Sequence, residues 1–404
     1  MQRIKAVVVG VFVALIVTIG GGRVLSEVAG NQAPGKAGAQ AGTLPKFAYD
    51  PTWPKPLPNN WRLGTVIGVK VDAKDHIWIV HRPNSLRPDE RYAAENPPQA
   101  ICCKPAPPVL EFDQAGTLLQ SWGGPGEGFQ WPPYGAPGSY FGEHGVFPDY
   151  KGNVWVGANN TGAGQILKFT RDGKFLLQIG HSGSSSRAIS RSNDTTVLNA
   201  ATAMEVSPRT NEVFVADGYG NRRVIVFDAD TGKYKRHWGA YGKRPEDTPV
   251  KWKPYGPNDP RPQQFATVHG ITLSRDGMVY VADRGNNRVQ AFKEDGTYVT
   301  EGLVAPATLG GGNNGSAHDV ALSPDPQQQF VYVADGLNQR IWIMRRSDLT
   351  MLGSFGHGGH EGGAFGHLTT LGVDSKGAIY AGETMEGKRV QRFKYTGMGS
   401  ASSN

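Results

Sequence analysis

A short motif that recurs along the chain constrains its fold more than any other feature of the sequence. The clearest copies read V-A-D-G-Y-G-N-R-R-V (215–224), V-A-D-R-G-N-N-R-V (281–289) and V-A-D-G-L-N-Q-R-I (333–341). With weaker copies included, the unit occurs six times, and its second strands start near Ile77, Val154, Val213, Val279, Val331 and Ile379. A unit repeated in this way predicts an array of similar supersecondary structures.

Each copy predicts four short strands joined by tight turns. Alternating runs such as I-W-I-V (77–80) and V-Y-V-A (279–282) are typical of strands, and pairs such as Asp276-Gly277 supply the positive φ angles of hairpin turns. The 55 glycines and 28 prolines fit a turn-rich, all-β chain. Stacking four-stranded sheets around an axis buries faces that no single sheet can bury alone. Arg222 or Arg223, with Arg288 and Arg340, is expected to tie strands together within the unit.

The repeated unit resembles the NHL repeat over about residues 61–395. The resemblance implies an all-β, six-bladed β-propeller of NHL-type repeats over residues 46–395. Its last blade shows only three strands, so we expect the segment K-F-A-Y-D (46–50) to close the ring. Residues 396–404 are predicted to be a flexible tail.

The amino terminus carries a targeting signal. A positively charged start precedes an apolar run at 6–22, which makes residues 1–28 a signal peptide or an uncleaved membrane anchor. Residues 29–45 are predicted to be a flexible linker. We therefore expect an exported protein, periplasmic or extracellular. Cys102 and Cys103, the only cysteines, are adjacent and are interpreted as two thiols or a bridged pair stiffening a loop.

The charge pattern argues against a nucleic-acid-binding protein. The net charge is +7, but the basic residues are dispersed and form no basic block.

We also expect the protein to be a monomer.

Histidines recur at one place in the repeat, eight residues before the turn glycine. His144 and His269 occupy it, His318 does so in a copy with a variant turn, and Thr369 occupies it in the last copy, with His367 two residues earlier. Inner strands of a propeller line its channel, so three imidazoles could meet there and bind a divalent metal, with zinc favoured. Three unconnected channel histidines are the alternative.

The arrangement is similar to that of peptidyl-α-hydroxyglycine α-amidating lyase, a six-bladed NHL propeller. The motifs I-W-I-V-H-R (77–82) and D-G-Y-G-N (217–221) carry this resemblance, together with the two histidines. It implies cleavage of a peptidyl-α-hydroxyglycine to a peptide amide and glyoxylate at a zinc held by His144 and His269. Tyr219 would take the hydroxyl proton, and Arg82 would favour its deprotonated form. The family's third histidine corresponds to Thr369, so the third ligand would be His318 or His367.

Two other functions remain open from the sequence. The first is an exported, non-catalytic module that binds a peptide, glycan or protein, with the insert 83–107 capping one face and the aromatic stretch 131–142 as a candidate patch, unless that stretch packs over the channel. The second is a lactonase-like hydrolase with calcium in the channel. The calcium ligands available to it would be Glu143, Asn314 and Asp319.

Overall fold

The computed structural model describes residues 43–159, 162, 164–183, 189–248, 255–256, 258–309 and 314–400. The predicted signal or anchor at 1–28 and most of the predicted linker lie outside these residues. Within the described part of the chain, no helix is long and apolar enough to cross a membrane.

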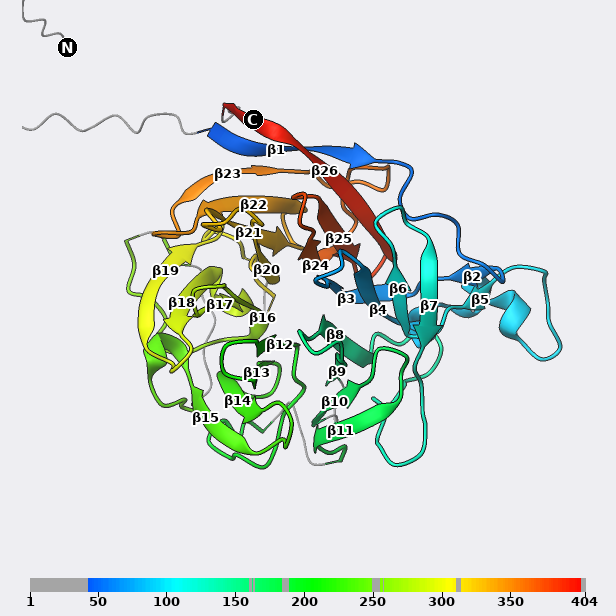
Figure 1. Ribbon diagram of the computed structural model, residues 1–404, viewed down its shortest axis with the longest axis horizontal. Helices are drawn as coiled ribbons and strands as arrows, with labels where there is room; N and C mark the ends of the chain where they lie inside the picture. The colour runs from blue at the N-terminus through cyan, green and yellow to red at the C-terminus, as the bar shows by residue number, and fades with distance from the viewer. Residues whose placement is uncertain are drawn as a thin grey trace, which may run out of the picture. The chain divides into compact units, whose positions relative to one another are not determined.

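Six four-stranded antiparallel sheets surround a central channel, which confirms the predicted six-bladed β-propeller (Figure 1). Blades one to three contain β3 (Thr65–Val71), β4 (Ile77–Arg82), β6 (Val109–Phe112) and β7 (Leu118–Trp122); β8 (Gly142–Pro148), β9 (Val154–Asn159), β10 (Gln165–Phe169) and β11 (Phe175–Gly180); and β12 (Ala203–Ser207), β13 (Glu212–Asp217), β14 (Arg223–Asp228) and β15 (Tyr234–Trp238). Blades four to six contain β16 (Val268–Leu273), β17 (Met278–Asp283), β18 (Arg288–Lys293) and β19 (Tyr298–Leu303); β20 (Asp319–Leu322), β21 (Phe330–Asp335), β22 (Arg340–Arg345) and β23 (Met351–Phe355); and β24 (Leu368–Val373), β25 (Ile379–Glu383), β26 (Arg389–Ser400) and β1 (Thr43–Asp50).

Both ends of the described chain share blade six. The predicted closing strand 46–50 lies within β1, which pairs with β26 along its whole length, from Thr43 opposite Ser400 to Asp50 opposite Arg392. The predicted propeller limits, 46 and 395, fall inside these two strands because the pairing continues beyond a bulge at Lys46/Phe47. Residues 43–45, assigned to the linker, and 396–400, assigned to the tail, are therefore strand residues.

A polar clamp found in blades three and four explains the recurring spacing within the motif. Arg223 Nε donates to Asp217 Oδ2 over 2.9 Å, and Arg288 Nε donates to Asp283 Oδ2 over 2.8 Å, with all four side chains buried. Each pair joins the end of a blade's second strand to the start of its third. Arg340 differs, since it stacks on Trp342 and donates to Ser354. The structural role predicted for these arginines is confirmed.

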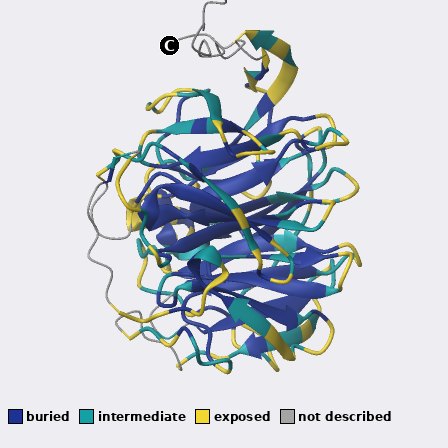
Figure 2. Cartoon of the chain, turned by 90° about the vertical axis from the view of Figure 1, so that its left-hand side faces the viewer, coloured by how far each residue is buried: buried dark blue, intermediate teal, exposed yellow. Residues whose placement is uncertain are grey.

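Apolar side chains fill the space between neighbouring blades. Figure 2 shows buried residues concentrated inside the stacked sheets, with exposed residues in the loops. The cluster between blades three and four is typical, because Phe214, Trp238 and Phe292 pack there with the valines of both sheets. The Asp-Gly turns adopt the predicted conformation, with φ of 86° at Gly277 and 93° at Gly296.

The insert 83–107 contains three 3₁₀ turns and a short strand: η1 (Pro83–Ser85), η2 (Pro88–Glu90), η3 (Tyr92–Ala94) and β5 (Lys104–Pro105). β5 pairs with β2 (Trp61–Arg62) beside blade one, at the rim of the ring in Figure 1. The insert is anchored by the buried ion pair between Lys388 Nζ and Glu90, which lie 2.5 Å apart. The adjacent Cys102 and Cys103 form a disulfide. The remaining 3₁₀ turns are η4 (Ala240–Gly242) and η5 (Arg284–Asn286).

Candidate functional site

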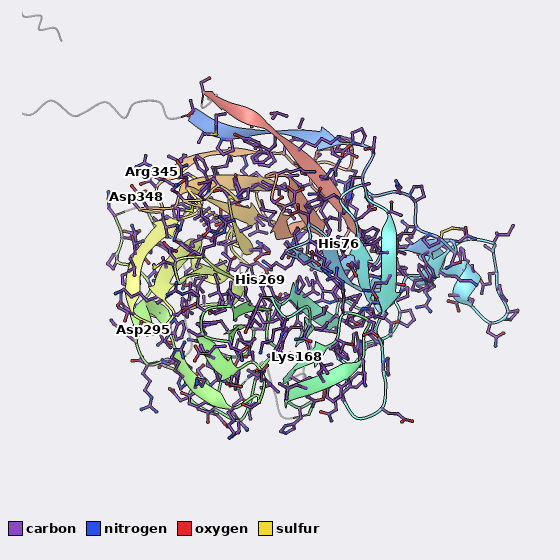
Figure 3. All side chains as sticks on the ribbon, viewed as in Figure 1. His76, Lys168, His269, Asp295, Arg345 and Asp348 are labelled. Carbon is purple, nitrogen blue, oxygen red and sulfur yellow. A yellow bond between two sulfur atoms is a disulfide. The ribbon has the colours of Figure 1, made fainter. Side chains whose placement is uncertain are left out.

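The inner strands bring one residue of each repeat to the channel. We call these equivalent positions the first channel ring: Ile67, His144, Thr202, His269, His318 and Thr369. Strand pairing is interrupted by a bulge at four of them, Ile67, His144, His269 and Thr369. A bulge leaves a residue outside the ladder and redirects its side chain, which is why bulges are common beside functional sites. Figure 3 shows His269 near the centre of the ring.

Two histidines of the first channel ring share one tautomer. His144 Nδ1 lies 2.6 Å from the carbonyl oxygen of Thr202, and His269 Nδ1 lies 2.7 Å from that of His318. Because a carbonyl oxygen only accepts hydrogen bonds, both Nδ1 atoms carry the proton and both Nε2 atoms present a lone pair. Carbonyl groups that fix a ring in this way are typical of metal-binding histidines.

Tyr219 meets both lone pairs. Its hydroxyl oxygen lies 3.1 Å from His269 Nε2 and 3.4 Å from His144 Nε2. The tyrosine stands between glycines that let its loop press against the neighbouring backbone: a Cβ on Gly218 would lie 1.9 Å from the oxygen of Val268. Tyr219 thus lies beside both of these histidines.

Arg284 completes this group, and sequence reasoning missed it. Its Nη1 donates to the Tyr219 hydroxyl over 3.3 Å, and its guanidinium carbon lies 5.2 Å from the centre of the Tyr219 ring. Arg284 directly follows β17, and Arg82, the last residue of β4, holds the equivalent position in blade one. That shared register was the signal that could have identified it.

Arg82 is buried beside the same chamber. Its Nε donates to the carbonyl oxygen of Glu143 over 2.8 Å. Burial, followed by the positive charges of Arg284 and Arg82 among other contributions, holds the pKa of His269 well below its usual range. The ring is therefore neutral, and two fixed cations make the chamber suited to an anionic ligand.

The two remaining candidate histidines are placed differently. His318 Nδ1 accepts the backbone N–H of Gly336 over 3.2 Å, so the proton of this ring lies on Nε2. This is the opposite tautomer to that of His144 and His269, and it leaves no lone pair at Nε2. His367, half-buried just before β24, lies beside His318, with ring centres 5.8 Å apart. Burial and then the charge of Arg284 lower the pKa of His367.

The donor atoms around Tyr219 fit a zinc ion in part of its coordination shell. Ligand atoms about 2.1 Å from a tetrahedral zinc lie roughly 3.4 Å from one another. The Tyr219 oxygen lies 3.1 and 3.4 Å from the two imidazole nitrogens, which matches this spacing. The chemistry of the set, two imidazoles and a phenol, also suits zinc. The position of the family's third histidine is held by Thr369, whose hydroxyl is a poor zinc ligand.

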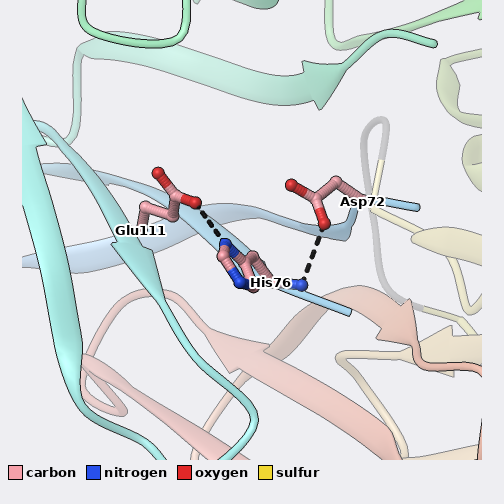
Figure 4. A group of neighbouring side chains, drawn as sticks. All are labelled: Asp72, His76 and Glu111. Carbon is pink, nitrogen blue, oxygen red and sulfur yellow. Dashed lines mark hydrogen bonds and ion pairs between the residues drawn. The ribbon is translucent and has the colours of Figure 1, made fainter. Parts of the chain in front are cut away.

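Another group has metal-ligand chemistry. Across the described ranges, one set of His, Cys, Asp and Glu has ligand atoms within 4.8 Å of one another: Asp72, His76 and Glu111 (Figure 4). The guanidinium of Arg171, from blade two, lies 2.8 Å from both His76 Nδ1 and Asp72 Oδ2 and also contacts Glu111. A cation is already supplied, so this set is an ion cluster joining two blades.

Two of the calcium ligands considered from the sequence, Glu143 and Asp319, have other partners. Glu143 Oε1 accepts from Trp131 Nε1 over 2.7 Å and from the Tyr134 hydroxyl over 2.6 Å, and burial raises its pKa to about 7. Asp319 Oδ2 instead faces Lys70, 3.6 Å away. The aromatic stretch 131–142 therefore turns part of its aromatic surface inward, against Glu143.

The chain is similar to several known proteins. A family model of the NHL repeat matches residues 265–292. Peptidyl-glycine α-amidating monooxygenase A of Xenopus laevis is 29% identical over 258 residues, covering 62% of this chain and 24% of that protein. Peptidyl-α-hydroxyglycine α-amidating lyase 1 of Drosophila melanogaster is 27% identical over 263 residues, covering 62% of this chain and 41% of the fly protein. A streptogramin B lyase structure aligns with a TM-score of 0.48 and 11% identity, covering 88% of this chain and 98% of that one.

The chain is a six-bladed β-propeller that carries the NHL repeat. Within that class it resembles peptidyl-α-hydroxyglycine α-amidating lyase and the amidating monooxygenases. The matched region makes up about a quarter of the Xenopus protein, at 24% of its length.

Proposed function

We propose that the channel of this propeller is the active site of a lyase that splits a peptidyl-α-hydroxyglycine into a peptide amide and glyoxylate. The observation that carries the proposal is the convergence of Tyr219, His144, His269 and Arg284 on one point. The similarity to the fly lyase supports the same reaction class.

The reaction moves one proton and breaks one bond. The substrate hydroxyl loses its proton, the carbon–oxygen double bond of glyoxylate forms, and the carbon–nitrogen bond breaks as the nitrogen gains a proton. Tyr219 is placed to take the hydroxyl proton and to return it to the departing amide. Arg284, which donates to the Tyr219 oxygen, stabilises negative charge there. Arg82 and Arg284 supply positive charge for the substrate carboxylate.

His144 and His269 would hold the zinc that the resemblance implies, beside the hydroxyl of Tyr219. If bound there, zinc would supply Lewis acidity that makes a substrate hydroxyl more acidic. The carbonyl contacts of the two Nδ1 atoms keep both imidazoles ready to bind it. Calcium is the less favoured cofactor, because it prefers oxygen ligands.

Glyoxylate release tests the activity. The purified chain is incubated with a benzoyl-α-hydroxyglycine, and the glyoxylate formed above the spontaneous rate is measured. We expect Tyr219→Phe to lower kcat by about 10²- to 10⁴-fold, the usual contribution of a positioned proton-transfer group. Tyr234→Phe, on an exposed outer strand, is the matched control and should leave kcat unchanged. Equal rates for wild type and Tyr219→Phe would refute the role of Tyr219.

Elemental analysis tests the metal separately. We expect near-stoichiometric zinc in the wild type, lost in the double variant His144→Ala/His269→Ala and retained in His237→Ala/His360→Ala, which changes histidines away from the channel. A chain that stays free of metal after zinc is offered would contradict the zinc proposal.

The proposal also includes that the protein is exported, is a monomer and has no nucleic-acid partner. If the hydroxyglycine substrate is recovered unchanged from the assay, the alternative function is favoured. That alternative is a non-catalytic module that binds a peptide, glycan or protein. Its candidate patch at 131–142 is weakened, because Trp131 is buried and Tyr134 donates its hydroxyl to Glu143.

A further inference from the structure

A second pocket of the channel lies at the mouth opposite to the one that holds Tyr219. Tyr219 and Arg284 lie in loops that follow second strands, whereas this pocket is bordered by turns that follow first strands, including Asp75 and Arg275. Its volume is about 450 Å³. A space of that size admits a small molecule.

The repeat also places six equivalent residues around this pocket. They stand three residues after the first channel ring, and we call them the lower channel ring: Lys70, Phe147, Glu205, Thr272, Ala321 and Gly372. All six line the pocket. Because corresponding positions of a closed ring face its axis, their chemistry is presented to one ligand.

Glu205 supplies the only carboxylate of the lower channel ring. Thr272 and the backbone of Leu273 donate hydrogen bonds to it. Its Oε2 is nevertheless buried and has no hydrogen-bond partner among the residues that the structure describes. A buried carboxylate oxygen without a donor is costly, and a ligand N–H group would remove that cost.

The charges around the pocket favour a cation. Lys70, the only basic residue of the lower channel ring, has its Nζ 3.6 Å from Asp319 Oδ2. The same oxygen accepts the Thr370 hydroxyl over 3.1 Å and the Leu371 N–H over 3.0 Å, which holds Asp319 in place. The charge of Lys70 also acts on Glu205. One lysine thus faces two carboxylates, so one negative charge remains to be neutralised.

The other ring members indicate which kind of cation fits. Phe147 and Thr272 occupy the blades on either side of Glu205, so an aromatic ring and a hydroxyl flank the carboxylate. Ala321 and Gly372 leave space on the opposite side. A carboxylate with an aromatic ring in the neighbouring blade suits an organic ammonium ion, which gains a hydrogen bond to the carboxylate and an apolar contact for its carbon chain. A divalent metal would require several oxygen ligands, and the ring offers one carboxylate.

We propose that the lower channel ring binds a small primary ammonium ion, with Glu205 accepting its N–H groups and Phe147 contacting its carbon chain. This inference does not rest on the proposed lyase activity, because none of these residues belongs to the group around Tyr219.

Calorimetric titration with ethanolammonium chloride at pH 8.5 tests the proposal, with sodium chloride matching the ionic strength. We expect saturable binding to the wild type and at least a tenfold weaker Kd for Glu205→Gln. Glu127→Gln, at an exposed loop position, is the matched control and should bind as the wild type does. Phe147→Leu should weaken binding by a smaller factor, and it serves as the deciding variant if Glu205→Gln does not fold.

Three outcomes would overturn the inference. They are no saturable binding to the folded wild type, equal affinity of the wild type and both variants, and binding of calcium chloride in place of the ammonium ion. A wild type that binds ethanolammonium but releases no glyoxylate would refute the lyase and leave this site intact. The reverse result would refute this site alone.

Discussion

A single extra residue gives blade three its tyrosine. The loop from Asp217 to Arg223 is one residue longer than the corresponding loop from Asp283 to Arg288 in blade four. The clamp at both ends is unchanged, so the added residue must protrude. Gly220 permits this, because a Cβ there would lie 2.2 Å from the Asn199 side chain. Tyr219 is the residue carried into the channel.

The candidate site was only partly predictable from single residues. The histidine register and the unique tyrosine pointed to three of the groups that the structure brings together. The tautomers could not be predicted, because each is fixed by a carbonyl oxygen of the next blade, at Thr202 and His318. Arg284 escaped notice since its copy of the motif looked like an ordinary repeat, with Asp283 and Arg288 in their structural roles.

Glu205 should make folding depend on pH. Burial raises its pKa from 4.5 to about 7. Between these values the folded chain holds more protons at Glu205 than the unfolded chain does. This contribution to stability is therefore complete below about pH 4.5 and is lost as the pH rises through 7.

Glu205→Gln removes that titration. From pH 5 to pH 8 we expect the free energy of unfolding of the variant to rise relative to that of the wild type. The gain should be at most about 3 kcal/mol, and less where solvent reaches the half-buried side chain. Urea unfolding at both pH values measures it, and a difference that is the same at both would contradict the assignment.

At the scale of the element, the clamp that joins second and third strands explains why the positions of the strands could be predicted from the sequence. Its residues contact each other within one repeat, so their spacing is visible in the sequence. The bulges in the inner strands were not visible, because they depend on how each strand fits its neighbours around the channel. Strand positions were thus predicted more fully than the directions of channel side chains.

Breaking one clamp should be costly. In Arg223→Met, Asp217 is left as a buried charge without its cation, and removing one partner of a buried pair costs about 3–5 kcal/mol. Arg345→Met, which breaks an exposed pair with Asp348, is the matched control and should cost less than about 1 kcal/mol. Denaturant unfolding of the two variants would contradict the clamp if their losses were equal.

At the scale of the whole molecule, ring closure depends on one strand from far away in the sequence. β1 is the outer strand of blade six, and Leu44 and Phe47 pack into the cluster between blades five and six. Phe47 stacks on Phe355 with ring centres 4.8 Å apart. The blade is complete only when the two ends of the described chain meet.

Truncation tests this closure. A chain that starts at Thr43 should fold and unfold in one cooperative transition, because it retains all of β1. A chain that starts at Pro51 lacks the strand and exposes one edge of β26, so we expect a lower midpoint in urea and a tendency to aggregate. Indistinguishable unfolding curves for the two chains would contradict the role of β1.

The pairing of β1 with β26 also determines where a support, a label or a further domain can be attached to the protein. Thr43 and Ser400 lie opposite each other in the outermost strand pair of blade six, and Figure 1 shows β1 and β26 at the rim of the ring. A resin, a fluorescent label or a fused domain joined at either end therefore leaves from the side of the ring. Immobilised molecules would keep both mouths of the channel accessible, so ligands of each mouth could be screened on one surface.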